Sequence, residues 1–283
     1  MSRDFILKTS RNNILRITSN GFENLSLSPC LILTHGFKGF KDWGFWNYTS
    51  EFFAKNGFFV LSFNFSHNGI GSSTDEFTEL DKFADNTITL EISELSEIIE
   101  HYRNGFFSKS SNSRIGLIGH SRGGAVSILT AAKLNNVYSV AVWASVAKLD
   151  RYTDRQKQEW RKKGFIEAMN TRTNQMMRMN VSLLNDIETN KSDFLNIESA
   201  VKSLNCPFLI VHGEQDLTVP VLEAKKLYEW SNKKNSSLAI IPSTGHTFNV
   251  SHPFEGTNNK FEIVLDKTYK FFKNNLLREH NDD

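Results

Sequence analysis

The chain has 283 residues, of which 39% are hydrophobic and 23% charged, and its formal net charge is +2. This composition is typical of a globular protein and excludes a disordered chain. The charges are nearly balanced and form no long run of one sign, which excludes a basic nucleic-acid-binding surface. At about 150 residues per domain, the length indicates two domains or one large domain with an insertion.

Neither a membrane span nor a disulfide or zinc framework is predicted. No stretch approaches the roughly 18 apolar residues that a spanning helix needs, and residues 1–8 hold no apolar segment of signal-peptide length. Cys30 and Cys206 lie far apart and form no C-x-x-C pair. We therefore expect a cytoplasmic protein with two reduced thiols, no metal and no membrane partner.

Short apolar runs alternate with longer helical patterns along most of the chain. Continuous apolar runs are typical of strands that are covered on both faces. We expect strands at Asn13–Ser19, Cys30–Thr34, Gly57–Phe65, Ile115–Ile118, Val137–Val146, Phe208–Val211 and Leu238–Ile241. Helices are expected at Leu80–Tyr102, Gly124–Leu134, Val221–Trp230 and Ile263–Leu276. This alternation predicts right-handed βαβ units and a mostly parallel sheet, which is an α/β fold.

Residues 147–205 interrupt this alternation. They show no strong buried strand and look helical, charged and rich in methionine. We expect residues 1–146 and 206–283 to form the core and residues 147–205 to be a helical insertion. Residues 151–180 contain eight basic and three acidic residues. Those basic side chains either form the solvated face of helices or attract an anionic substrate.

Ser121 lies in a motif that predicts a nucleophilic serine. Gly119, Ser121 and Gly123 form a G-x-S-x-G pattern between the apolar run Ile115–Ile118 and the helical pattern Gly124–Leu134. A serine on a sharp strand-to-helix turn has a strained backbone, and its neighbours two positions away must be small because chain segments approach closely there. We therefore predict that Ser121 is the nucleophile rather than part of an ordinary turn.

The segment His35-Gly36-Phe37 directly follows the first continuous apolar run. A turn at this place can direct a backbone N–H at the position where a tetrahedral oxyanion forms. We predict the backbone N–H groups of Phe37 and Arg122 as the two oxyanion donors. The alternative for the first segment is a plain glycine turn with a capping histidine.

Asp216 is the predicted catalytic acid. It lies in a short loop after the run Phe208–Val211, directly before a helix that Pro220 starts. An acid there can hold a histidine in the required tautomer and stabilise its cation. Glu214, two residues earlier, and Asp150, after the run Val137–Val146, are the alternatives.

His246 is the predicted catalytic base among the eight histidines of the chain. It follows the last apolar run and comes 30 residues after Asp216. His252 is the nearby alternative. The order serine, acid, histidine, with each residue following a strand, is the order of the α/β-hydrolase arrangement.

The sequence resembles the α/β-hydrolase superfamily over essentially its whole length. Within it, the chain looks most similar to the esterase and serine-aminopeptidase-like branch (hydrolase 4, dienelactone-hydrolase-like). The matching residues are His35-Gly36-Phe37, the turn Gly119–Gly123, the segment His212–Asp216 with Val219-Pro220, and Gly245–Phe248. The resemblance implies that residues 147–205 form a cap over the active site.

These patterns predict a serine hydrolase that cleaves small-molecule carboxylic esters through an acyl-enzyme, with no cofactor. Two alternatives remain open. One is an aminopeptidase or amidase of the same fold, which would need acidic residues to bind the substrate amine, and no such pair is evident. The other is a non-catalytic binding protein that keeps the fold.

Overall fold

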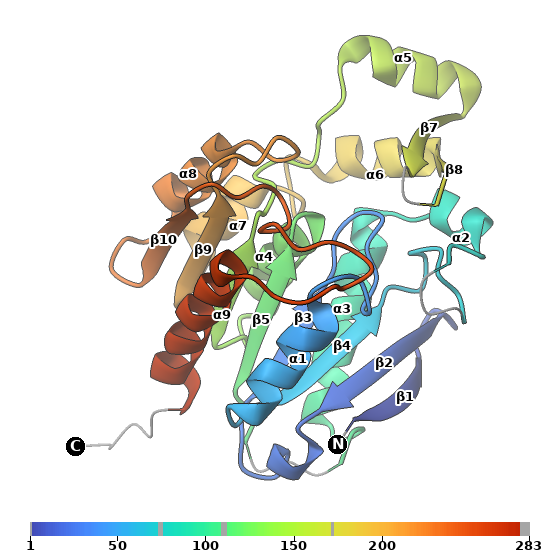
Figure 1. Cartoon of the computed structure of the whole chain (residues 1–283). Coiled ribbons are helices and arrows are strands. Elements are labelled where there is room, and N and C mark those ends of the chain that lie inside the picture. The colour runs from blue at the N-terminus through green and yellow to red at the C-terminus, as the bar shows by residue number, and fades with distance from the viewer. Residues whose placement is uncertain (1, 73–75, 109–111, 171–172, 278–283) are drawn as a thin grey trace.

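One large sheet organises the molecule. The computed structural model describes residues 2–72, 76–108, 112–170 and 173–277. Within these residues, eight strands form a sheet in the order β1-β2-β4-β3-β5-β6-β9-β10 (Figure 1). The six strands from β4 to β10 in this order are parallel, and β1 and β2 pair antiparallel at one edge. Their bounds are β1 Arg3–Lys8, β2 Ile14–Asn20, β3 Cys30–Thr34, β4 Phe59–Asn64, β5 Ile115–His120, β6 Ser139–Trp143, β9 Phe208–Gly213 and β10 Ser236–Ile241.

The continuous apolar runs are explained by burial on both faces of the sheet. All five residues of β3 are buried. Cys30 and Ile32 pack into one hydrophobic core, while Leu31 and Leu33 pack into a second core on the opposite face. Successive strand residues point to opposite faces, so a strand between two helical layers needs apolar residues at every position. The predicted mostly parallel sheet is confirmed.

Helices cover both faces of the sheet. The core with Cys30 and Ile32 includes side chains of α3 Ile88–Arg103, α4 Arg122–Leu134, α7 Ile197–Ser203 and α8 Val221–Trp230. The other core includes side chains of α1 Trp46–Lys55 and α9 Asn259–Phe272, which lie in front of the sheet in Figure 1. A short 3-10 helix, η1 Phe22–Asn24, precedes β3, and a π-helical turn, η2 Lys273–Leu277, extends α9. The result is a three-layer arrangement of helices, sheet and helices.

Two details of the N-terminal half differ from the prediction. The N-terminal strand has a partner, β1, which the sequence analysis missed. The single helix expected at Leu80–Tyr102 is two helices, α2 Leu80–Ala84 and α3. Thr87 separates them because its backbone is extended and its side chain accepts a hydrogen bond from the N–H of Leu90, which makes it an N-cap.

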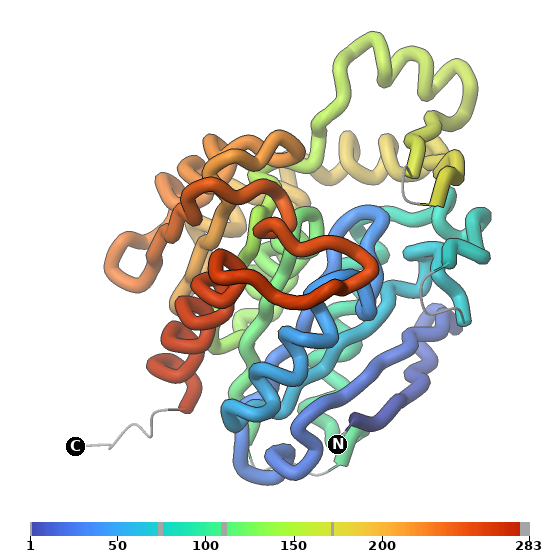
Figure 2. The backbone as a smooth tube through the Cα atoms, in the orientation of Figure 1, coloured from blue at the N-terminus to red at the C-terminus, as the bar shows by residue number. Residues whose placement is uncertain are grey.

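Residues 147–205 leave the sheet after β6 and return before β9, as the trace in Figure 2 shows. They form α5 Asp154–Lys163, β7 Phe165–Asn170, β8 Gln175–Asn180, α6 Val181–Asn190 and α7. The expectation of a purely helical insertion was wrong, because β7 and β8 pair as an antiparallel hairpin. In β8, Met177 and Met179 are buried while Met176 and Arg178 are exposed. The methionines therefore follow the two-residue period of a strand.

The segment ends in α7, which precedes β9. The helix α7 packs against α4 and α8, which cover the sheet. Its buried side chains, Ile197, Ala200 and Val201, are part of the hydrophobic core on that face, as are buried side chains of α5, β8 and α6. The remainder, α5, β7, β8 and α6, lies beyond the end of the sheet where β5 and β9 end (Figure 1).

Candidate active site

Ser121 occupies a strained turn between β5 and α4. Its backbone angles are φ 57° and ψ −122°, a conformation that a residue with a side chain adopts at appreciable cost. A Cβ atom on Gly119 would lie 2.4 Å from the carbonyl oxygen of Gly123, and one on Gly123 would lie 2.3 Å from the carbonyl oxygens of Thr34 and His35. The two glycines of the motif are therefore required by close packing around the serine.

The loop after β3 lies against this turn. A Cβ atom on Gly36 would come within 2.9 Å of the Cβ of Ser121 and 3.4 Å of the backbone nitrogen of Arg122. Arg122 is the first residue of α4, and the N–H groups of a first helical turn have no acceptor within the helix. The helix dipole adds partial positive charge at the same end. The N–H groups of Phe37 and Arg122 thus stay the predicted oxyanion donors, on two adjacent segments.

Asp216 and His246 form a hydrogen-bonded pair at the ends of β9 and β10. The Nδ1 atom of His246 lies 2.7 Å from Oδ2 of Asp216. The other carboxylate oxygen accepts hydrogen bonds from the N–H groups of Thr218 and Val219, at 2.9 and 2.8 Å. Burial alone would raise the pKa of Asp216, but hydrogen bonds from His212, His246 and Val219 outweigh it and lower the pKa. Asp216 is therefore held as a carboxylate against the imidazole.

The residues considered as alternatives for the catalytic acid and the catalytic base make other contacts. Asp150 accepts a hydrogen bond from the Lys157 ammonium at 2.5 Å. Glu214 accepts one from the backbone N–H of Ser243 at 3.2 Å. The Nδ1 atom of His252 accepts the N–H of Gly44 at 2.9 Å.

Two histidines that the sequence analysis did not single out support this pair. His120, the last residue of β5, donates from Nε2 to the carbonyl oxygen of His246 at 2.9 Å. His212, near the end of β9, donates from Nε2 to the carbonyl of Val219 at 2.8 Å and lies 3.4 Å from Oδ2 of Asp216. Burial lowers the pKa of His120 to about 3, so its ring stays neutral. Their positions at the ends of the strands that lead to Ser121 and Asp216 were the signal that could have found them.

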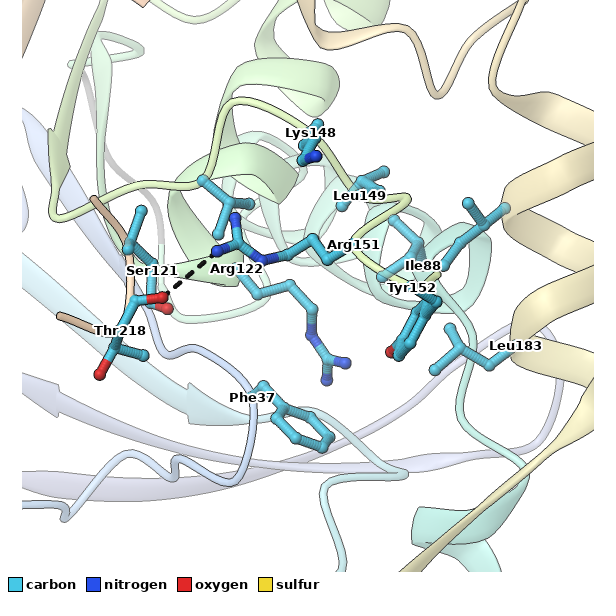
Figure 3. A pocket seen from close by; sticks show the side chains of 13 residues that line it. Phe37, Ile88, Ser121, Arg122, Lys148, Leu149, Arg151, Tyr152, Leu183 and Thr218 are labelled. Carbon is cyan, nitrogen blue, oxygen red and sulfur yellow. Dashed lines mark hydrogen bonds between the residues drawn. The ribbon is translucent and has the colours of Figure 1, made fainter. Parts of the chain in front are cut away.

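Two cavities of about 150 Å³ each meet at Ser121. Cavity A is lined by Ser121, Phe37 and Tyr152 together with Leu183 and Ile187 of α6 (Figure 3). Cavity B is lined by Ser121 and His246 together with Gly36, Trp43 and Trp46. Ser121 is thus shared by two cavities, and His246 lines only cavity B. No aspartate or glutamate of the described residues lines either cavity.

The described residues contain no group of three or more histidine, cysteine, aspartate or glutamate side chains that could hold a metal ion. No described helix is long and apolar enough to cross a membrane.

The sequence model of the prolyl oligopeptidase family matches residues 43–279, which is most of the chain. The chain belongs to the prolyl oligopeptidase family. This family membership, together with the order and positions of Ser121, Asp216 and His246, confirms the predicted α/β-hydrolase superfamily. The chain therefore has the α/β-hydrolase fold.

Two curated proteins match this chain over short segments. Human ABHD12B is 41% identical over 66 residues, which cover 22% of this chain and 18% of ABHD12B. A Mycoplasma genitalium protein, whose name proposes an esterase or lipase, is 36% identical over 73 residues, or 26% of each chain. The matched parts span about a quarter or less of these relatives' length.

Solved structures match over nearly the whole chain at lower identity. A structure of DcsB with its substrate analogue has a TM-score of 0.77 at 16% identity and covers 97% of this chain and 100% of that one. The esterase Pf2001 of Pyrococcus furiosus has a TM-score of 0.63 at 21% identity and covers 97% of this chain and 91% of that one. These similarities establish a shared fold.

Proposed function

We propose that the protein is a serine carboxylesterase in which Ser121 is the nucleophile, His246 the general base and Asp216 the residue that orients it. The observation that carries this proposal is the placement of Ser121 and His246 on one cavity, with His246 hydrogen-bonded at 2.7 Å to a buried carboxylate. A nucleophile and a base that a third group orients form the arrangement of covalent acyl transfer.

The reaction then takes two steps. His246 removes the proton of the Ser121 hydroxyl while Oγ attacks the ester carbonyl, and the N–H groups of Phe37 and Arg122 stabilise the oxyanion. The carbon–oxygen bond to the alcohol breaks, and His246 gives its proton to the leaving alcohol. In the second step His246 takes a proton from water, the hydroxide attacks the acyl-enzyme, and Ser121 recovers its proton as the acid leaves.

The two cavities indicate how an ester substrate is oriented at Ser121. The general acid must reach the leaving oxygen, and His246 lines cavity B but not cavity A. We therefore assign the leaving alcohol to cavity B, beside Trp43 and Trp46. The acyl group is assigned to cavity A, beneath α6 of the cap.

Ester rather than peptide cleavage is favoured by the chemistry of the cavities. An aminopeptidase needs carboxylates that bind the substrate amine, and no described acidic side chain lines either cavity. The names of the Mycoplasma genitalium relative and of Pf2001 also support an esterase. Because the chain belongs to the prolyl oligopeptidase family, amide cleavage is the alternative that the experiment must address.

The test compares wild-type protein with Ser121→Ala. A fluorophosphonate probe should label the wild type at Ser121 and leave the variant unlabelled. 4-Nitrophenyl esters should be hydrolysed by the wild type, with aminoacyl anilides turned over far more slowly. Preferred turnover of the anilides would establish an amidase instead. Absence of both labelling and turnover would favour a binding protein.

A further inference from the structure

The charged side chains of cavity A are all basic. Three of the described residues that line it carry a positive charge, Arg122, Lys148 and Arg151, and the rest are mostly apolar. A cation buried beside an acyl group is costly unless the protein or the substrate supplies a partner. The partners of the three cations therefore indicate what the cavity can bind.

Arg122 has one carboxylate partner behind the cavity. Its Nη2 atom lies 2.6 Å from Oε1 of the buried Glu91, which also accepts a hydrogen bond from Asn86 at 2.7 Å. The guanidinium carbon lies 4.8 Å from the centre of the Phe37 ring. Figure 3 shows the side chain pointing from the serine turn towards Phe37 and Tyr152. Glu91 and Phe37 thus fix the guanidinium in the cavity wall.

The guanidinium keeps free hydrogen-bonding capacity. Glu91 accepts a hydrogen bond from Nη2, and the Arg122 side chain, which lines cavity A, keeps 15% of its surface exposed. A guanidinium has five N–H donors in a planar fork that matches a carboxylate. An acceptor from outside the protein can therefore bind Arg122 without displacing Glu91.

The two other cations of cavity A differ in whether a carboxylate balances their charge. Arg151 is paired with Glu223 at 2.5 Å and donates to the carbonyl of Thr218 at 3.2 Å. Lys148 is exposed and has no ion-pair partner among the described residues. The cavity wall therefore has one positive charge more than its nearby carboxylates balance.

Three arginines of the cap differ from Lys148 in this respect. Arg155, Arg161 and Arg178 are paired with Glu159, Glu188 and Glu167 respectively. These three arginines are neutralised on the cap itself, which fits a solvated helix and hairpin surface. Lys162 and Lys163 of α5 also have no ion-pair partner among the described residues, but of these unpaired lysines only Lys148 lines cavity A.

We propose that cavity A selects an acyl group that ends in a carboxylate, so that the substrates are half-esters of short dicarboxylic acids. This inference rests on the proposed acyl transfer at Ser121. A cavity of about 150 Å³ holds a group of benzene size, which corresponds to a short chain. The apolar side chains Ile88, Leu183 and Ile187 contact its methylene groups, while Arg122 and Lys148 bind the terminal carboxylate. Hydrolysis releases the alcohol and the dicarboxylate.

The test uses two esters of the same shape and leaving group. The mono-4-nitrophenyl ester of adipic acid carries a terminal carboxylate, and 4-nitrophenyl 6-methylheptanoate replaces it with an uncharged isopropyl group. The measured quantity is the ratio of kcat/KM for the anionic ester to kcat/KM for the neutral ester. We expect a ratio of at least about ten in the wild type, because a charge-assisted hydrogen bond provides that discrimination. High salt should lower the ratio.

Three variants identify the residues responsible. The double variant Arg122→Met/Glu91→Met removes the buried pair together, so that no uncompensated charge is left and folding is preserved. It should lower the ratio by about tenfold. Lys148→Met, at an exposed position, should lower it by about two- to fivefold. Arg155→Met, a change of equal charge on the cap surface, should leave the ratio at the wild-type value.

The outcomes separate this inference from the proposed function. Turnover of both esters with a ratio of one or less, or a ratio that neither Arg122→Met/Glu91→Met nor Lys148→Met lowers, would overturn the carboxylate site and leave the esterase intact. If neither ester is hydrolysed and Ser121 is not labelled by a fluorophosphonate, the proposed function fails and this inference fails with it.

Discussion

The imidazole of His246 and the carboxylate of Asp216 meet at 2.7 Å although 30 positions separate them in the chain. The parallel neighbours β9 and β10 produce this contact, because each residue follows the carboxyl end of one of these strands. A hydrogen bond from Nδ1 leaves Nε2 of His246 as the atom that can accept a proton from Ser121.

Replacing Ser121 or His246 with alanine should lower kcat for 4-nitrophenyl esters by several orders of magnitude. The double variant should be hardly worse than either single variant, because residues that act as one unit have strongly non-additive effects. Steady-state kinetics measure the loss, and circular dichroism checks that the fold is retained. Additive losses in the double variant would contradict a shared catalytic step.

Asp216→Asn should lower kcat by about 10⁴, because an amide no longer holds the required histidine tautomer. Asp150→Asn and Glu214→Gln are matched changes at the two alternative acids and should lower kcat little. Asp150 contacts Lys157, and Glu214 contacts the backbone of Ser243. A larger loss in either control than in Asp216→Asn would reassign the catalytic acid.

His120→Phe should lower kcat by about ten- to hundredfold, because the loop that carries His246 loses its hydrogen bond at 2.9 Å and the base is misplaced. Phenylalanine keeps a ring against Phe45, so the packing is preserved. His101→Phe is the control, since the His101 ring bonds within its own helix turn, to the carbonyl of Glu97. Equal kinetics for the two variants would remove His120 from the positioning of His246.

Glu94→Gln should change how stability depends on pH. Burial raises the pKa of Glu94 to about 7 from an ordinary value of 4.5, against hydrogen bonds from Ser66 and Asn13. Between these values the folded protein keeps a proton that the unfolded chain loses, so the free energy of unfolding falls as pH rises from 4.5 to 7, by about 3 kcal/mol for this group.

Urea unfolding across this pH window measures the effect. Glutamine cannot titrate, so we expect a flatter pH profile in Glu94→Gln than in the wild type. Glu97→Gln serves as the control, because the carboxylate of Glu97 accepts hydrogen bonds from Ser10 at the surface. Parallel profiles for the wild type and Glu94→Gln would show that Glu94 does not bind this proton.

Ile187→Phe should shift acyl-chain preference towards shorter esters. Ile187 of α6 lines cavity A, and a larger side chain reduces a volume of about 150 Å³. The measurement is kcat/KM across 4-nitrophenyl acetate, butyrate and hexanoate. Ile263→Phe, an exposed position on α9, is the control. An unchanged ranking in Ile187→Phe would show that the acyl group does not occupy cavity A.

The sequence by itself determined the class of fold and the candidate residues, because the signals for both are local. Strands buried on both faces need continuous apolar runs, and the turn at Ser121 needs glycine two positions away on each side. The order serine, acid, histidine follows directly from these local signals. Each of these features acts within a few residues, so it can be read without knowing which strands are neighbours.

The tertiary structure alone decided which distant side chains meet. Asp216 rather than Asp150 pairs with His246 because β10 lies beside β9, and the order of strands in a sheet depends on packing between segments far apart in the chain. The same holds for the pair Arg122 and Glu91, which joins α4 to α3. The hairpin β7–β8 also escaped prediction, because its short strands are stabilised by cross-strand pairing and by contacts with α2 rather than by a continuous apolar run.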